Sequence, residues 1–423
     1  MGSSPSRYFP SRRAVLGGIA GATLAAPFIR RAAADVAPIP VGAVVGLTGG
    51  TAPWGTPVAD ATRLAVDEIN KSGGIKSKGG AKLALTIADH QSNPQMAGTQ
   101  TERLIQTANV VAVFGNAVSG CTMVGSAVAD RYKTPLISTD SGDTLSARGL
   151  QHYFRIGAKT TLLSQTAIDF AVATAKATGV SPKKAAILAD DTTFSQDAAN
   201  ALVRALKGTD WALFENISFP PGHVDDFAPI IQRLKLNQVD LFLQATTAPD
   251  GIQILQAVKA LDYNPIAMLH VLGAPYTSDF ANSTKADGNY ITDAVGYVPE
   301  LANSNAKISE FGRLYKTTYG RDLNDQSSLA VNGVGVLYDA LERAPSLDRA
   351  AVTQAIRETD LAIGANPFII RDGIKFSPEG DNTRAKALIM QILNQENRIV
   401  YPKDIATVPV VWPSPKWSDP KRG

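Results

Sequence analysis

The chain has 423 residues, of which 44% are hydrophobic and 19% are charged, a composition typical of globular proteins and unlike that of disordered or fibrous ones. This length is enough for two hydrophobic cores of ordinary size. A single cysteine, Cys121, excludes an intrachain disulfide, and its apolar neighbours indicate a packed side chain rather than a reactive thiol.

The first 34 residues have the features of an export signal. Ser11-Arg12-Arg13 precedes a mildly apolar stretch that ends at Ile29, and Ala32-Ala33-Ala34 offers a cleavage site of small residues. The paired arginines resemble a twin-arginine signal, so we expect residues 1–34 to direct the protein to the periplasm by that route. A disordered basic tail is the alternative interpretation.

Removal of this segment changes the charge of the chain. It deletes five arginines and no acid, which lowers the formal net charge from +3 to about −2. The remaining chain has no basic excess that would predict nucleic-acid binding. No later segment approaches the roughly 20 apolar residues of a membrane span.

From Ile39 onward, short apolar runs alternate with segments of helical periodicity, the pattern of parallel sheets covered by helices. The predicted strands are 41–47, 83–89, 110–115, 135–138, 185–190, 239–244, 266–271 and 290–295. The predicted helices are 58–70, 94–107, 122–131, 162–177, 195–206, 227–234, 251–260, 307–319, 327–341 and 349–358. The pattern of residues 368–413 predicts extended strands with breaks, and that of 411–423 predicts an irregular tail. The strands form two series joined near 153–157, so we expect two α/β domains.

Parallel sheets bind ligands at the carboxyl ends of their strands, which selects the loops after Leu47, Asp89, Gly115 and Ser138 in the first series and after Asp190, Gln244 and Val271 in the second. Trp54 lies in a run of Gly, Thr and Pro, which predicts a partly exposed indole on a loop. Ser119 follows the third strand, where a hydroxyl and the free N–H groups of a helix start favour an anion. Helix capping by Ser119 or Thr122 is the alternative. Residues 138–142 are again rich in hydroxyls, so the two loops together predict a carboxylate-binding site.

Sequence signals of catalysis are absent. The chain has no P-loop, no G-x-S-x-G elbow and no G-x-G-x-x-G after a strand. Its four histidines are not at metal-ligand spacing, so we expect neither a metal nor a cofactor. Ser119 with His90 is a weak nucleophile–base pair that would suggest a periplasmic hydrolase. We therefore expect no enzyme.

Several segments, taken in order, resemble the periplasmic leucine/isoleucine/valine-binding family, the type I solute-binding proteins of ABC importers. They are Leu47-Thr48-Gly49, Trp54-Gly55, 65–70 followed by Gly73-Gly74-Ile75, Asp89 with Asn93-Pro94, Phe114-Gly115 with Ser119, 135–138, 190–194 and 373–380. The resemblance covers nearly the whole chain after the signal. It implies an α/β fold of two Rossmann-like lobes with parallel sheets joined by a three-stranded hinge. The first lobe would be 36–155 plus 296–369, and the second 156–295 plus 370–410.

The same resemblance implies ligand contacts. The family holds a ligand carboxylate with the serine that matches Ser119 and with the loop that matches 138–142, and aromatic residues matching Trp54 and Phe194 contact the ligand. The full set of expected contacts is Trp54, Ser119, Ser138, Thr139, Asp140, Ser141, Gly142, Phe194, Thr247 and Asp250, with His90, Ala274 and Tyr276 as further candidates.

Two departures from the family pattern affect the ligand. In the family an acidic residue faces the α-ammonium of the ligand, but the matching segment here, 273–276, contains no acid. The second-lobe tyrosine of the family matches 247–248 here, where no tyrosine occurs. A buried ammonium without an acidic partner is costly. This favours an acid or amide that lacks a free α-amine, unless Asp250, His90 or Asp140 replaces the missing acid.

The implied function is a monomeric periplasmic receptor of an ABC importer. It would capture a small carboxylate-bearing solute, either an amino acid or an aromatic or aliphatic acid or amide, by lobe closure and deliver it to membrane permease subunits. A missing nucleotide-binding motif fits a receptor whose ATPase is a separate subunit. A ligand-binding sensor that reports to a membrane receptor is the alternative.

Overall fold

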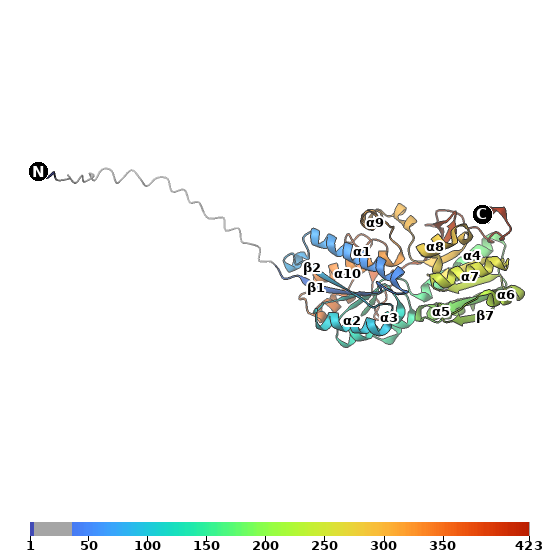
Figure 1. Ribbon diagram of the computed structural model, residues 1–423, viewed down its shortest axis with the longest axis horizontal. Coiled ribbons are helices and arrows are strands. Elements are labelled where there is room, and N and C mark those ends of the chain that lie inside the picture. The colour runs from blue at the N-terminus through green and yellow to red at the C-terminus, as the bar shows by residue number, and fades with distance from the viewer. Residues whose placement is uncertain (4–35, 423) are drawn as a thin grey trace. The chain divides into compact units, whose positions relative to one another are not determined.

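The computed structural model describes residues 1–3 and 36–422 (Figure 1). Ala37–Gly423 form one compact unit, separate from Met1–Val36. The predicted export signal, 1–34, lies almost entirely outside the described residues. Among the residues that are described, no helix combines the length and the apolar character needed to cross a bilayer.

The first lobe is built on a five-stranded sheet in the order β2-β1-β3-β4-β5, with every neighbouring pair parallel. Its strands are β1 (Ile39–Val45), β2 (Leu83–Asp89), β3 (Val113–Asn116), β4 (Leu136–Ser138) and β5 (Tyr153–Arg155). Helices α1 (Ala52–Lys71), α9 (Ala306–Tyr319), α10 (Asp325–Arg343) and α11 (Arg349–Arg357) bury one large apolar cluster against the sheet. A smaller cluster joins the sheet to α2 (Pro94–Gln106) and α3 (Ser119–Arg131). The sheet is therefore covered on both faces, as continuous apolar strands require.

The second lobe is built on a seven-stranded sheet in the order β14-β13-β10-β9-β8-β6-β7. Its strands are β6 (Lys184–Asp190), β7 (Ala212–Phe219), β8 (Leu241–Ala245), β9 (Ala267–Val271), β10 (Thr292–Val295), β13 (Leu388–Leu393) and β14 (Glu396–Tyr401). The pairs from β7 to β10 are parallel, whereas β13 and β14 add to the edge antiparallel. The short strands β11 (Asp360–Leu361) and β12 (Ile374–Lys375) pair separately.

The helices connect these strands. They are α1 (Ala52–Lys71), α2 (Pro94–Gln106), α3 (Ser119–Arg131), α4 (Thr160–Thr178), α5 (Thr193–Leu206), α6 (Ala228–Leu236), α7 (Ala248–Ala260), α8 (Ser278–Thr284), α9 (Ala306–Tyr319), α10 (Asp325–Arg343) and α11 (Arg349–Arg357). Most predicted elements agree with these bounds to within about three residues. The expected α/β fold with parallel sheets in two lobes is thereby confirmed.

The chain passes between the two sheets three times, after β5, after β10 and after β12. The first and third crossings lie side by side, since the Arg155 N–H donates to the Gly380 carbonyl at 2.8 Å. The buried Arg155 guanidinium also lies 3.3 Å from the Asp381 carboxylate. Sheet membership assigns the strands to lobes, and the boundaries at 155, 295 and 369 stay predictions.

The prediction that Trp54 lies on a loop is wrong, because α1 begins at Ala52 and holds Trp54 in its first turn. Pro53 is compatible with this start, since the first helical residues have no N–H partner within the helix. Gly55 allows α1 to pack on the end of β1, because a Cβ there would lie 2.0 Å from the Gly46 carbonyl oxygen.

Two further segments differ from expectation. Strand β7 was not predicted, since it is an edge strand that alternates exposed and half-buried residues and contains no continuous apolar run. Most of the described part of the predicted irregular tail, 411–422, lacks helix and strand but is docked on the second lobe. The Trp412 indole N–H donates to the Val180 carbonyl at 2.8 Å, and the Trp417 indole N–H to the Tyr263 carbonyl at 2.9 Å.

Candidate functional site

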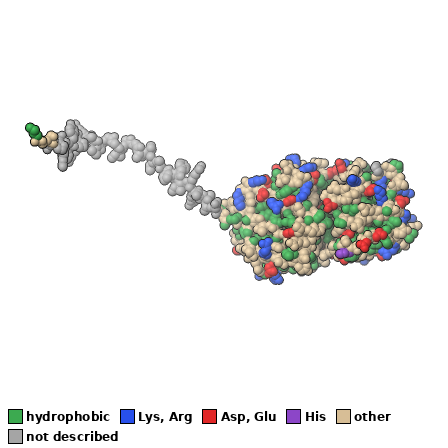
Figure 2. Space-filling model, viewed as in Figure 1, with side chains coloured by type: hydrophobic (Ala, Val, Ile, Leu, Met, Phe, Trp, Pro, Cys, Tyr) green, Lys and Arg blue, Asp and Glu red, His purple; other side chains and the backbone are tan. Residues whose placement is uncertain are grey.

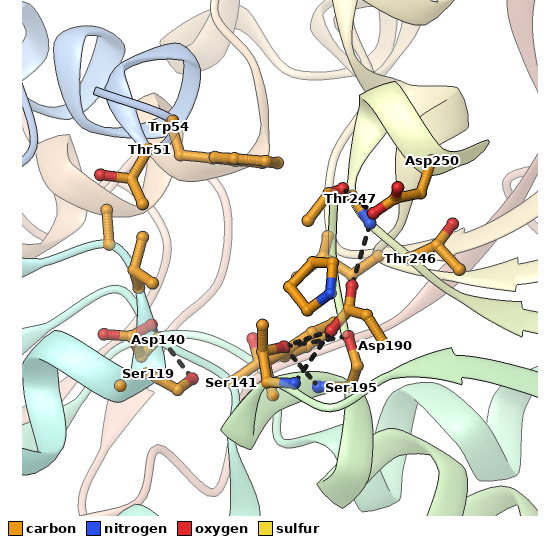
Figure 3. Close-up of a pocket in the computed structure, with 18 of the residues that line it drawn as sticks. Thr51, Trp54, Ser119, Asp140, Ser141, Asp190, Ser195, Thr246, Thr247 and Asp250 are labelled. Atoms are coloured by element: carbon orange, nitrogen blue, oxygen red, sulfur yellow. Dashed lines mark hydrogen bonds between the residues drawn. The ribbon is translucent and has the colours of Figure 1, made fainter. Parts of the chain in front are cut away.

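A cavity of about 380 Å³ lies where both sheets present the carboxyl ends of their parallel strands. The segments after β1, β3 and β4 line its first-lobe side, and those after β6, β7, β8 and β9 line its second-lobe side. Gln326, in the first turn of α10, completes the wall. In Figure 3 the labelled side chains of the two lobes face each other across this space. Strand ends are where sheets of this kind hold ligands.

Trp54 forms one wall of the cavity (Figure 3). Its side chain is partly buried and packs against the first-lobe core. It also hydrogen-bonds to Tyr276 of the second lobe. Burial raises the pKa of Tyr276 well above the usual range for a tyrosine. Phe194, in the first turn of α5, lines the second-lobe side. The two aromatic side chains expected to contact a ligand therefore both border the cavity.

The start of α3 faces a carboxyl group that belongs to the protein itself. Ser119 Oγ donates to Asp140 Oδ1 at 3.3 Å, and the Thr122 hydroxyl donates to Asp140 Oδ2. Ser138 Oγ also donates to Oδ2, at 3.3 Å. The N-cap residue is Val118, which provides no side-chain cap, so neither Ser119 nor Thr122 caps the helix.

Burial is the main influence on this carboxyl group. It raises the pKa of Asp140 to about 6, against the opposing effects of the Thr122 hydrogen bond and the Arg155 charge. The hydroxyls of the predicted anion site are clustered here but donate to Asp140, so anion binding at this helix start stays a prediction.

Two aspartates brace the second-lobe loops. Asp190 accepts hydrogen bonds from the Thr192 N–H at 3.1 Å and the Thr247 N–H at 3.1 Å, which ties the end of β6 to the start of α7. Burial raises the pKa of Asp190. Asp250 accepts from the Gly222 N–H at 3.1 Å and from Thr247 Oγ1 at 2.9 Å. These carboxylates fix the shape of the wall while they border the cavity.

The charge of the lining is one-sided. Asp140, Asp190 and Asp250 line the cavity, whereas none of the described lining residues is a lysine, an arginine or a histidine. On the face of the molecule seen in Figure 2, by contrast, basic and acidic side chains are interspersed. A ligand that carries a negative charge finds hydroxyl and N–H donors here but no cationic side chain.

Two lining atoms lack a hydrogen-bond partner within the described chain, Thr246 Oγ1 and Gln326 Oε1, and both residues are 4% exposed. Buried polar atoms are almost always paired, so these two are exceptions in residues that line the cavity. Neither residue was predicted from the sequence. The position of Thr246 at the end of a predicted strand could have identified it, whereas Gln326 comes from a distant helix without a local signal.

Five predicted contacts do not border the cavity: Ser138, Thr139, Gly142, His90 and Ala274. Ser138 instead supports Asp140, since its hydroxyl accepts from the Asp140 N–H at 3.1 Å. Ala274 lies against Gly251, where a Cβ would come within 2.4 Å of the Ala274 Cβ. Trp54, Ser119, Asp140, Ser141, Phe194, Thr247, Asp250 and Tyr276 do border it.

Ser119 and His90 have different partners, which gives no support to the hydrolase alternative. His90 is buried, with Nε2 3.3 Å from the Asn116 carbonyl oxygen and Nδ1 3.6 Å from Cys121 Sγ. Burial lowers the pKa of His90 and raises that of Cys121 to about 12. The Ser119 hydroxyl donates to Asp140 instead. Cys121 is a packed thiol, as predicted.

Comparisons with known proteins agree with this architecture. A Leu/Ile/Val-binding protein homolog 8 of Brucella abortus (strain 2308) is 27% identical over 406 residues, which cover 93% of this chain and 97% of the relative. A leucine binding protein LivK of Thermotoga maritima has a TM-score of 0.75 at 20% identity, covering 87% of this chain and all of that one. A solute binding protein of an ABC transporter from R. palustris, solved with benzoate, has a TM-score of 0.73 at 16% identity, covering 89% of this chain and 98% of that one.

The family model described as periplasmic binding protein matches residues 38–396, which include every strand of the two sheets except β14 and every segment that lines the cavity. The chain therefore belongs to the periplasmic binding protein family.

Proposed function

We propose that this protein is the receptor of an ABC importer of the branched-chain amino acid type. It captures a small solute that carries a carboxylate or an amide, either an amino acid or an aromatic or aliphatic acid or amide. The lobes close over the solute, and the closed form delivers it to the membrane permease. The receptor acts as a monomer in the periplasm.

The cavity between the strand ends of the two lobes is the observation that supports this proposal. Its volume of about 380 Å³ is within the range of small-molecule sites and suits a ligand the size of leucine or benzoate. Two or three hydrogen bonds and the burial of an apolar group between Trp54 and Phe194 are enough for roughly micromolar affinity. Ligand shifts the lobes only if it binds the closed form more tightly.

The relatives support this range of ligands and the proposed transport role. One structural neighbour is named a leucine binding protein, and another was solved with benzoate. The cavity here has hydroxyl donors at the start of α3 and apolar walls, which fit either kind of molecule.

The test is a titration of the purified protein with amino acids, aromatic and aliphatic carboxylates and their amides, by isothermal titration calorimetry. We expect at least one compound to bind with micromolar affinity and to reduce the radius of gyration in small-angle X-ray scattering. Failure of every compound to bind would overturn the receptor function. Binding without compaction would overturn lobe closure.

Export is tested separately. We propose that residues 1–34 use the twin-arginine route, so replacement of Arg12 and Arg13 by lysine should abolish appearance of the protein in the periplasm. Continued export of that variant would contradict the route and leave the receptor function untouched.

A further inference from the structure

Asp140 occupies the position at which the α3 start and the β4 loop converge. The residue is 3% exposed and borders the cavity. Its two carboxyl oxygens accept hydrogen bonds from the hydroxyls of Ser119, Thr122 and Ser138. The donors that a carboxylate ligand would use at this helix start are therefore shared with a carboxyl group of the protein.

No neighbouring cation neutralises Asp140 directly. Arg155 is the nearest contributor, but its guanidinium donates to the Ser141 carbonyl at 3.0 Å and the Gly142 carbonyl at 2.6 Å and lies 3.3 Å from Asp381. Two other titratable groups interact electrostatically with Asp140, the Tyr153 hydroxyl of β5 and the Cys121 thiol of α3.

The second lobe adds a further acid beside this loop. Asp197 of α5 accepts from the Thr144 N–H at 3.0 Å, and a Cβ on Gly142 would lie 3.0 Å from both Asp197 Oδ2 and Ser119 Oγ. The surroundings of Asp140 thus contain a cation that is engaged elsewhere, two neutral groups and a second carboxylate. Burial dominates, and it raises the pKa of Asp140 to about 6.

A ligand carboxylate at this end of the cavity would meet Asp140 at close range. Two carboxylates that share one site do not both stay ionised, so one of them takes up a proton. A carboxamide has no such requirement. Its carbonyl accepts from the hydroxyl and N–H donors of α3, and its NH₂ group donates to the Asp140 carboxylate or to the unpartnered Gln326 Oε1.

We propose that Asp140 determines which head group the cavity accepts: a carboxylate binds only together with one proton, whereas a neutral carboxamide binds without one. This inference rests on the proposed receptor function. Binding of an acid is then coupled to uptake of a proton, whereas the affinity for an amide does not depend on pH above neutrality. Asp140 is the specificity-determining residue, and Ser119 is the donor that both the ligand and Asp140 use.

The experiment compares matched acid and amide probes on the wild-type protein: benzoate with benzamide, and isobutyrate with isobutyramide. Calorimetry is run between pH 6 and pH 8 in two buffers of different ionisation enthalpy, which yields the protons taken up per ligand bound. We expect the Kd of a bound acid to rise roughly tenfold per pH unit above pH 6, with about one proton taken up at pH 8. The Kd of a bound amide should stay constant above pH 7.

The variant Asp140→Asn keeps the size of the side chain and removes the ionisable group. We expect its Kd for acids to be independent of pH and, at pH 8, lower than that of the wild type by a factor of roughly 50 to 100. Asp250→Asn, at the second-lobe end of the cavity, is the matched control and should retain the pH slope. Proton uptake by the wild type tests the inference even if the Asp140 variant does not fold.

The outcomes separate the inference from the function on which it rests. An acid that binds the wild type equally well at pH 6 and pH 8 without proton uptake overturns the role of Asp140 and leaves the receptor intact. Failure of all four probes and of every compound in the wider titration overturns the receptor function, and the inference with it.

Discussion

Thr144 and Asp197 connect the β4 loop of the first lobe to α5 of the second. The backbone N–H of Thr144 donates to Asp197 Oδ2 at 3.0 Å, and the Thr144 hydroxyl donates to the same oxygen. Thr144 follows β4 of the first lobe, and Asp197 lies in α5 of the second. These bonds form only when the β4 loop and α5 are close, so under the proposed lobe closure they would contribute to the free energy of the closed form and not to that of either lobe alone.

Replacement of Asp197 by alanine should therefore weaken ligand binding without contact to the ligand, since Asp197 does not line the cavity. Loss of two hydrogen bonds to a carboxylate favours the open form by roughly 1–2 kcal/mol, which corresponds to a 5- to 30-fold higher Kd. Calorimetry measures the Kd, and X-ray scattering measures the radius of gyration. Asp169→Ala is the control, because Asp169 bonds within α4 to Gln165. Equal affinities of the Asp197 variant and the wild type would contradict this role.

Trp54 should matter more for binding than for folding. Its side chain is only partly buried and borders the cavity, so Trp54→Ala removes an apolar wall from the ligand and leaves most of the first-lobe core intact. We expect a loss of about 1–3 kcal/mol in binding free energy and a smaller loss in the free energy of unfolding. Trp211→Ala is the control, since that indole bonds to Ser181 outside the cavity. The reverse ranking of the two losses would make Trp54 an ordinary core residue.

Much of the fold could be predicted from the sequence because its signals are local. Apolar runs such as Ala185 to Asp190 are fully buried in a covered parallel sheet, and the rule that ligands bind at strand ends then selects the loops that line the cavity. The loops with Trp54 and Ser119 were selected in this way, whereas Phe194 was named as a contact through the family resemblance. The start of α1 was misjudged since Gly55 indicates a turn until the Gly46 backbone against which it packs is known.

The remaining features depend on contacts between distant segments. Asp140 lies in a loop rich in hydroxyl side chains, which led to the prediction that it contacts the ligand. Only the fold shows that its carboxyl group accepts hydrogen bonds from Thr122 and Ser119. Gln326 reaches the cavity because α10 begins there, and nothing near it in the chain indicates this. Such placements are set by packing across the molecule, which periodicity and spacing do not encode.

The position of Gln326 depends on a buried ion cluster at the start of α10. Arg371 donates to Asp325 Oδ1 at 2.9 Å, to Asp372 Oδ2 at 3.1 Å and to Ser328 Oγ at 3.0 Å, and its side chain is 1% exposed. Arg371→Met would leave two buried carboxylates without their partner. We expect the free energy of unfolding to fall by roughly 3–5 kcal/mol, as measured by urea denaturation.

A partly exposed ion pair is the control for this variant. Arg398 bonds to Glu300 at 2.7 Å and its side chain is 33% exposed, so Arg398→Met should cost no more than about 1 kcal/mol. Similar losses in the two variants would show that the Arg371 cluster contributes no more than a surface pair.

Burial of Asp140 should also make the free energy of unfolding of the ligand-free protein depend on pH. The pKa of Asp140 in the folded protein, about 6, lies above the ordinary aspartate value, so between pH 4 and pH 6 the folded state binds more protons than the unfolded state. Its contribution to stability is therefore fully present below that window and is lost as the pH rises through it. Two pKa units correspond to roughly 3 kcal/mol, which is the largest loss expected by pH 8.

Asp140→Asn removes this pH-dependent contribution to stability, because an amide does not ionise. Relative to the wild type, the variant should gain up to about 3 kcal/mol of unfolding free energy between pH 4 and pH 8, whatever its absolute stability at either pH. Urea denaturation at pH 4, 6 and 8 measures the difference for both proteins. A difference between variant and wild type that stays constant over this range would mean that Asp140 is already ionised at pH 4, and it would remove the physical basis for proton-linked capture of acids.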